Sequence, residues 1–241
     1  MSAVTAPVAS NLPHEMRKPL EHLSSVLLGM FGESFLGLTV FGPSLDGRST
    51  VGESIETVAV VSRVDLQLVR RLAEHAAELG RRGFTAPLLM TPDYITASLD
   101  TFPLELIEIH QHHATAAGLD YFDQLTINTS HVRLQCEREF KRILMRIRQG
   151  LLASGGQETV LEALELDIGR HTLRTLRGYL WLKDQREYLA PDAVLSHCGR
   201  LVGRSLNGIA NAMRTGGEHG WSELVALYDD VEVLAAAANR E

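Results

Sequence analysis

The apolar pattern of this 241-residue chain changes character near Gly118, and that change limits the folds open to it. Before Gly118, helical and strand-like patterns alternate, whereas after it every apolar segment repeats at helical spacing. All strands must therefore pair within the first half, and the later helices must bury their apolar faces against one another. We expect an α+β fold, with a small mixed sheet and helices over residues 14–118, followed by an all-α antiparallel helical bundle over residues 130–241. Residues 1–13 are predicted to form a flexible tail.

The first half predicts four strands, each a short apolar or β-branched run bounded by turn-forming residues. They are Leu36–Phe41, Thr57–Ser62, Ala86–Met90 and Phe102–Ile109. Helices are predicted over His14–Phe31 and Val64–Gly80, where apolar residues recur at helical spacing. A short helix is predicted to begin at Pro92, with Thr91 as its N-cap. The order of these elements predicts a sheet with helices packed on it.

The second half predicts helices only. Ser130 is placed to cap the first of them, and breaks containing glycine or proline separate the others. Their ranges are His131–Leu152, Glu158–Leu166, Arg170–Lys183, Ala193–Met213 and Trp221–Ala238. The apolar residues of these helices can serve the core of a bundle or the interface of a homodimer, so a protein partner stays open.

Composition narrows the functional classes. The formal net charge of -7 argues against nucleic acid as a partner. No stretch approaches the roughly 18 apolar residues of a membrane span, and the N-terminal residues carry no targeting pattern. Cys136 and Cys198 lack the spacing of a metal site or a disulfide framework and are predicted to be buried and reduced. We expect a cytoplasmic protein with no membrane partner.

The candidate site is a glycine turn between two strands, with acids close behind it. Gly42 follows the first predicted strand, and Glu53 and Glu56 lead into the second. Glycine lets the backbone approach a phosphate closely, and a nearby hydroxyl such as that of Ser44 can donate a hydrogen bond to it. Carboxylates on neighbouring strands can hold the divalent cation that phosphoryl and nucleotidyl transfer require.

A third acid is expected from the predicted strand Phe102–Ile109. Glu105 and Glu108 both lie there, and the alternation of a strand points them to opposite faces. Glu105 is preferred, and Glu108 is the alternative. The predicted metal ligands are thus Glu53, Glu56 and Glu105, and the last two are the candidates for catalysis.

This order of elements resembles the nucleotidyltransferase superfamily that includes DNA polymerase beta and the minimal nucleotidyltransferases. The segments Gly83–Ile95, Phe102–Glu105 and Leu134–Glu139 also resemble a bacterial group of nucleotidyltransferase-like proteins with a C-terminal helical bundle. The family pattern is a strand, Gly-Ser, a loop, then Asp-x-Asp entering an apolar strand, with a third Asp from a later strand. For an active site, the resemblance implies Mg²⁺ and a nucleoside triphosphate, with Gly42 and Ser44 against the nucleotide.

The sequence departs from that pattern at the positions that matter for chemistry. Pro43 replaces the family's serine, which removes a hydroxyl and a backbone N–H. Ser54 takes the place of the first metal-binding Asp, and the longer Glu56 takes the place of the second. A serine hydroxyl is a poor ligand for a hard cation. We therefore interpret the chain as a nucleotidyltransferase-like protein with a degenerate metal and nucleotide site, which serves nucleotide binding or protein interaction without catalysis.

Two alternatives stay open. One is an active Mg-dependent nucleotidyltransferase that transfers a nucleoside monophosphate to a small molecule or a protein. The other is a helical-bundle interaction module in which the first half has no chemical role.

Basic side chains recur along the helix predicted over His131–Leu152. Arg138 and Arg142 share one helix face and are candidates for nucleotide binding, although acids in the same turns would equally suit a solvated surface. A second basic cluster lies in the helix predicted over Arg170–Lys183 and consists of Arg170, His171, Arg174 and Arg177. The segment from His110 to His113 is interpreted as a polar strand exit with exposed histidines.

Overall fold

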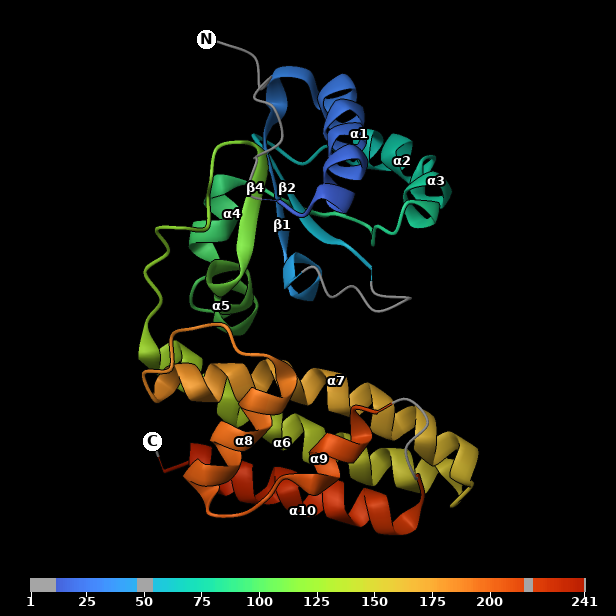
Figure 1. Cartoon of the computed structure of the whole chain (residues 1–241), viewed down its shortest axis with the longest axis vertical. Helices are drawn as coiled ribbons and strands as arrows, with labels where there is room; N and C mark the ends of the chain where they lie inside the picture. The colour runs from blue at the N-terminus through green and yellow to red at the C-terminus, as the bar shows by residue number, and fades with distance from the viewer. Residues whose placement is uncertain (1–11, 47–53, 215–218, 241) are drawn as a thin grey trace. The chain divides into compact units, whose positions relative to one another are not determined.

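The computed structural model describes residues 12–46, 54–214 and 219–240. The chain divides into two compact units (Figure 1). The first unit consists of Met1–Leu99 and Glu108–Thr126, and the second consists of Asp100–Ile107 and Ile127–Glu241. The candidate ligand Glu53 and the first eleven residues of the predicted tail lie outside the described residues. Among the described residues, no helix combines the length and the apolar character needed to cross a membrane.

Four strands form the sheet of the first unit, within the residues that the structure describes. They are β1 (Phe35–Phe41), β2 (Glu56–Val61), β3 (Leu88–Met90) and β4 (His113–Gly118), in the spatial order β3-β2-β1-β4. β1 pairs antiparallel with β2 and with β4, whereas β2 pairs parallel with β3, so the sheet is mixed as predicted. The last five residues of β2 are buried, which explains their apolar and β-branched character.

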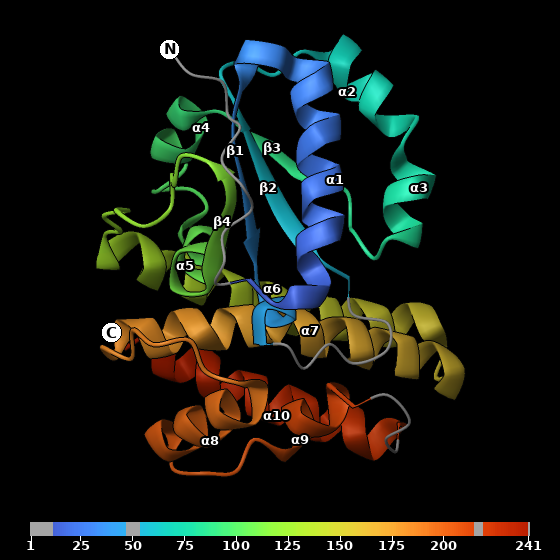
Figure 2. The same cartoon turned by 45° about the horizontal axis from the view of Figure 1, so that its top comes forward.

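Helix α1 (His14–Phe31) covers one face of this sheet (Figure 2). Its buried stripe includes Leu20, Leu23 and Leu27, which are fully buried in the same core as the β1 side chains. The spacing of three and four residues places them on one side of the helix. The prediction of this helix is confirmed over its full length.

The helix predicted over Val64–Gly80 is two helices, so that prediction is wrong. α2 (Leu66–Ala73) is capped by Asp65, whose Oδ1 accepts a hydrogen bond from the Gln67 N–H at 2.8 Å. α3 (Ala76–Arg81) follows a tight turn in which the N–H of His75 donates to the Leu72 carbonyl. Neither glycine nor proline marks this break, so the sequence carries no signal for it. The next helix, α4 (Pro92–Ala97), confirms its predicted cap, because Thr91 Oγ1 accepts from the Tyr94 N–H at 3.0 Å.

The strand predicted over Phe102–Ile109 is wrong, because this segment forms helix α5 (Pro103–Gln111). Its apolar residues Leu104, Leu106, Ile107 and Ile109 are all buried. An apolar run buried on several sides has no clear period, and such a run fits a buried strand as well as a buried helix. The fourth strand of the sheet is instead β4, whose alanine-rich sequence has low strand propensity.

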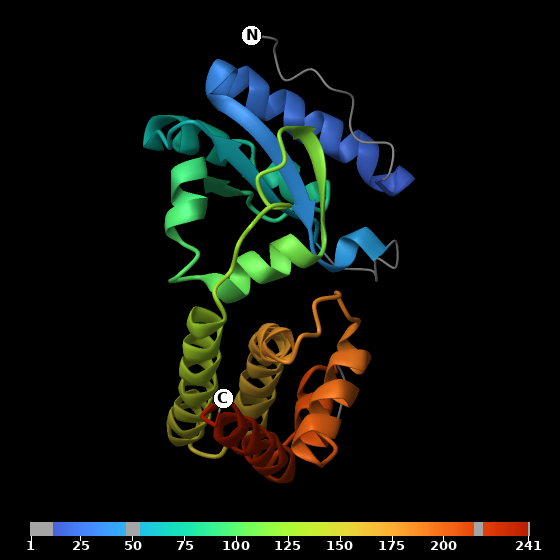
Figure 3. The same ribbon diagram turned by 90° about the vertical axis from the view of Figure 1, so that its left-hand side faces the viewer.

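Helices alone make up the second unit within its described residues (Figure 3). They are the first residues of α5 and the whole of α6 (Thr129–Ser154), α7 (Glu158–Leu182), α8 (Pro191–Val202), α9 (Asn207–Ala212) and α10 (Trp221–Ala238). α6 and α7 lie side by side, and their apolar faces join those of α8, α9 and α10 in one core. This arrangement confirms the predicted fold class of a mixed sheet with helices, followed by a helical part.

Glycines misled the prediction of helix ends in this unit. Gly169 lies inside the single helix α7, where two helices were predicted. A Cβ at this position would lie 2.6 Å from the carbonyl oxygen of Ala212, so the glycine permits close packing against α9 instead of ending a helix. The helix predicted over Ala193–Met213 is in turn divided into α8 and α9 after Gly203, which has a φ of +73°.

The two cysteines are buried and free, as predicted. Cys136 on α6 and Cys198 on α8 direct their sulfur atoms at the carbonyl oxygens of Thr175 and Leu176, each at 3.8 Å. Burial raises the pKa of both thiols, to about 12 for Cys198. These thiols are therefore unreactive core side chains.

Candidate functional site

The turn between β1 and β2 has the geometry of a site in which the backbone comes close to a ligand. Gly42 has a φ of +81°, and its N–H donates to the His112 carbonyl at 3.0 Å. The 3-10 turn η2 (Pro43–Asp46) follows directly. A Cβ on Gly42 would lie only 3.1 Å from Glu56 Oε2, so the Glu56 carboxylate lies against the bare glycine. The structure thus brings together the predicted residues Gly42 and Glu56.

Ser44 lies in the same turn and is 5% exposed. Its Oγ has no hydrogen-bond partner among the described residues. A buried hydroxyl without a partner costs about 1–3 kcal/mol, so native structures usually pair such groups. A hydroxyl in this position is suited to donate to a phosphate oxygen of a ligand.

The three predicted metal ligands fall in different parts of the chain, with Glu56 in the first unit, Glu105 in the second and Glu53 outside the described residues. Glu56 begins β2 opposite Phe41, and Glu53 lies outside the described residues. Glu105 lies on helix α5 in the second unit, where Gln135 Nε2 donates to its Oε2 at 3.0 Å and Arg174 Nη1 lies 3.7 Å from its Oε1. The described part of the chain contains no cluster of three or more His, Cys, Asp or Glu residues that could hold a metal ion.

The Glu56 carboxylate at the Gly42 turn suits one kind of metal. Magnesium is commonly held by one or two protein carboxylates together with the phosphates of a substrate. Glu56 fits that role for an ion that arrives with a nucleotide. Ser54, at the first acid position of the family pattern, is exposed and offers only a hydroxyl.

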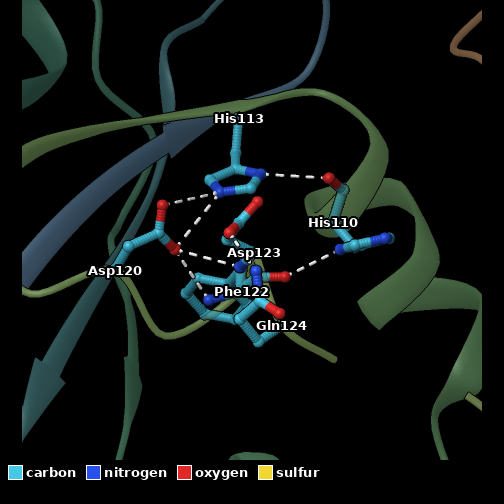
Figure 4. Close-up of polar contacts among 6 residues, drawn as sticks. All are labelled: His110, His113, Asp120, Phe122, Asp123 and Gln124. Atoms are coloured by element: carbon cyan, nitrogen blue, oxygen red, sulfur yellow. Dashed lines mark hydrogen bonds and ion pairs between the residues drawn. The ribbon is translucent and has the colours of Figure 1, made fainter. Parts of the chain in front are cut away.

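The histidines between α5 and β4 form an internal polar cluster (Figure 4). His113 begins β4, and its side chain is 9% exposed, so the prediction of an exposed histidine is wrong at this position. Its Nε2 lies 3.1 Å from Asp120 Oδ2, and its Nδ1 lies 3.1 Å from the His110 carbonyl oxygen. His110 Nδ1 donates to the Phe122 carbonyl at 2.8 Å. The cluster thereby joins both ends of β4 to the end of α5.

Asp120 also accepts hydrogen bonds from two backbone N–H groups in this cluster. Its Oδ1 lies 2.8 Å from the Phe122 nitrogen and 3.1 Å from the Asp123 nitrogen. Burial alone would raise the pKa of Asp120, but the Phe122 N–H and the His113 ring outweigh it, so the pKa lies below the ordinary 3.8. These contacts describe a structural turn, because each carboxylate oxygen is already engaged by the protein.

In the second unit, the structure brings residues of both basic clusters and Glu105 to one cavity. Its volume is about 360 Å³, and it lies between α5, α6 and α7. Its charged lining consists of Glu105, Glu139, Arg142, Arg170, His171 and Arg174. We call it the arginine cavity. Sequence reasoning found both clusters but missed their convergence, because nothing local in the sequence aligns α6 with α7.

Two of the predicted basic residues do not line this cavity. Arg138 is exposed on α6 and has no ion-pair partner among the described residues. Arg177 is 5% exposed, and its guanidinium lies 4.4 Å from the ring centroid of Tyr188, whose hydroxyl accepts from Nη2 at 3.0 Å. Arg177 is therefore part of the packing of this unit.

Comparison with known proteins identifies the fold. No protein-family model matches the sequence, and no curated protein matches it by sequence. The crystal structure of the spectinomycin adenyltransferase AAD(9) from Enterococcus faecialis, with ATP and spectinomycin, is similar, with a TM-score of 0.58. The two chains are 12% identical, and the match covers 92% of this chain and 98% of the other. With the mixed sheet and the helical second unit, this similarity shows that the chain has a nucleotidyltransferase-like fold.

Proposed function

We propose that this protein binds a nucleoside triphosphate at the Gly42 turn and has lost the metal ligands needed for nucleotidyl transfer. The observation that carries the proposal is the buried hydroxyl of Ser44 in the Gly42 turn, which has no hydrogen-bond partner among the described residues. The Ser44 hydroxyl suits a phosphate of a nucleotide because it can donate a hydrogen bond, whereas the Gly42 N–H already donates to the His112 carbonyl.

The loss of catalysis is argued from the residues beside that turn. Nucleotidyl transfer depends on positioned metal ions that neutralise charge on the phosphates. Ser54 cannot supply a carboxylate, and Pro43 has no N–H to donate. The similar fold of a protein whose structure contains ATP supports ATP as the first ligand to test.

A working Mg-dependent nucleotidyltransferase is the second candidate, and the retained Glu56 favours it. Glu56 would then hold a magnesium ion together with the nucleotide phosphates. The protein would transfer a nucleoside monophosphate to a small molecule or a protein. Glu53, the second predicted acid beside the turn, lies outside the described residues and is the first candidate for a further carboxylate.

Thermal unfolding with ATP, GTP, CTP and UTP, with and without Mg²⁺, separates these candidates. A ligand that binds only the native state raises the melting temperature. We expect a rise of several degrees with at least one nucleotide, with or without Mg²⁺, and a smaller rise for Ser44→Ala. Glu33→Gln removes an exposed acid from the first unit and should leave the rise unchanged.

Two results would contradict the proposal. A rise that requires Mg²⁺, disappears in Glu56→Gln and accompanies transfer of label from a nucleotide would identify an active enzyme. No rise with any nucleotide would leave the helical interaction module as the better account. Transfer of label onto a cell extract or onto the protein itself needs no prior choice of acceptor.

A further inference from the structure

We propose that the arginine cavity of the second unit binds a phosphate group of a second ligand, separate from the nucleotide at the Gly42 turn. Every residue that lines the cavity belongs to the second unit. The site can therefore be argued from that unit alone. The inference goes beyond the proposed function, because it concerns a different set of residues and a different ligand group.

The arrangement of arginines on α7 is costly without a counter-ion. Arg170 and Arg174 are four residues apart, so they lie one above the other on the same face of the helix. Like charges at this spacing destabilise a helix, and Arg142 adds a third positive charge from α6. An anion bound between the three guanidinium groups would attract each of them and offset their mutual repulsion.

Arg170 is the cavity arginine whose negatively charged partner would be a ligand. Its side chain is exposed to solvent and lines the cavity, and it makes no ion pair with any described residue. Two arginines of the neighbouring helix α6 do have acids to contact. Arg133 lies 3.1 Å from Glu137, and Arg146 contacts Asp167.

The two glutamates in the cavity only partly balance the arginines. Arg142 Nη1 lies 3.5 Å from Glu139 Oε1, and Arg174 Nη1 lies 3.7 Å from Glu105 Oε1. Both distances are longer than the roughly 2.7–2.9 Å between nitrogen and oxygen in strong charge-assisted hydrogen bonds. Glu105 is also held by Gln135 Nε2, at 3.0 Å, which keeps its carboxylate from turning fully toward an arginine. Guanidinium N–H groups of Arg170 and Arg142 are therefore available to a ligand.

Phosphate is the ligand chemistry that this geometry fits best. Each guanidinium presents a planar fork of donors that matches two oxygens of a phosphate. Three arginines against two glutamates leave an excess of positive charge in the lining of the cavity. The volume of about 360 Å³ is enough for a phosphorylated small molecule.

The test uses the full chain and inorganic pyrophosphate as the probe. Thermal unfolding and titration calorimetry are measured with pyrophosphate and with sodium chloride at matched ionic strength. We expect pyrophosphate to raise the melting temperature of the wild type more than chloride does. We expect Arg170→Gln and Arg174→Gln each to weaken binding about tenfold or more, since each removes charge-assisted hydrogen bonds.

Arg214→Gln is the matched control, because Arg214 is an exposed arginine of the same unit that does not line the cavity. It should bind pyrophosphate like the wild type. Arg170 is exposed, so its replacement should not prevent folding, and the far-UV circular dichroism of each variant checks this. Arg170→Lys keeps the charge but loses the fork, and should bind with intermediate affinity.

The results separate this site from the Gly42 turn. Pyrophosphate binding that survives in Ser44→Ala and fails in Arg170→Gln supports the arginine cavity, whether or not nucleotides bind. Binding that fails in Ser44→Ala and survives in Arg170→Gln overturns the cavity and leaves the proposed function standing. If pyrophosphate raises the melting temperature no more than chloride does, the proposal of a phosphate site in the arginine cavity is also overturned.

Discussion

The carboxylate of Asp230 on α10 accepts a hydrogen bond from the backbone N–H of Gly208 at 2.8 Å, and so caps helix α9 from another helix. The same Oδ2 accepts from the Ile209 N–H at 3.2 Å, while Arg204 Nη2 lies 3.0 Å from Oδ1. The residue at the N-cap of α9, Leu206, has no side chain that could satisfy these N–H groups. Asp230 is 1% exposed, so this buried contact connects α10 to the start of α9 in the core of the second unit.

Asp230→Ala should therefore destabilise the second unit by about 2–4 kcal/mol, because it leaves buried N–H groups and the Arg204 charge without their partner. Urea unfolding followed by circular dichroism measures the loss. Asp230→Asn keeps an oxygen that can accept from Gly208 and should cost less. Equal losses for the two variants would show that the hydrogen bonds to α9 contribute little.

Gly208→Ala should lower the free energy of unfolding by about 1–3 kcal/mol or more, because overpacking at a close backbone contact forces the helices apart. An added Cβ would lie 2.3 Å from the carbonyl carbon of Ala226 on α10. Gly29→Ala is the matched control, because Gly29 lies within α1 and a Cβ there meets nothing within 4 Å. That variant should stabilise the protein by about 0.5–1 kcal/mol through helix propensity. Chemical denaturation of both variants tests the contrast in sign.

Gln135→Leu should loosen the start of α5. Gln135 Oε1 accepts from the Leu104 N–H at 2.9 Å, and this buried side chain also donates to Glu105. The loss of a buried acceptor for a helix N–H costs about 1–3 kcal/mol. Amide hydrogen exchange at Leu104 should become faster in the variant. Gln135→Glu keeps the acceptor and should retain the protection at Leu104, although it places a second carboxylate beside Glu105.

Asp120 should make stability depend on pH in the acid range. Its pKa is lower in the folded protein than the ordinary 3.8, so the folded state holds its proton less tightly than the unfolded chain. The stabilisation is therefore complete above the unfolded pKa and is lost as the pH falls through the lowered folded value. Asp120→Asn should reduce stability at neutral pH, and the difference from the wild type should vanish in acid. A difference that stays constant with pH would contradict this assignment.

The parts of the fold that the sequence predicts well are those set by local patterns. β1 and β2 are apolar runs next to turns, and α10 has a clean helical period, so all three are found where expected. β4 is different, because its alanines and threonine have no strong strand preference and its place depends on pairing with β1. A partner distant in sequence cannot be read from the segment itself.

The candidate site divides in the same way. Gly42 and Glu56 are both predicted site residues, and the turn between paired strands brings them together. Glu105 was assigned to a strand, and its actual contacts with Gln135 and Arg174 depend on how α5 packs against α6 and α7. The arginine cavity requires the same packing, so no local pattern could indicate it.

Helix α5 has a consequence for anyone who divides this protein into fragments. Its residues up to Ile107 group with the second unit, whereas those from Glu108 onward group with the first. A fragment that starts at residue 127 would lose Leu104, whose side chain fills the space above Gly178, and would expose that part of the core to water. Expression of the helical half alone should therefore begin before Asp100, or the fragment will have a hydrophobic opening that favours aggregation.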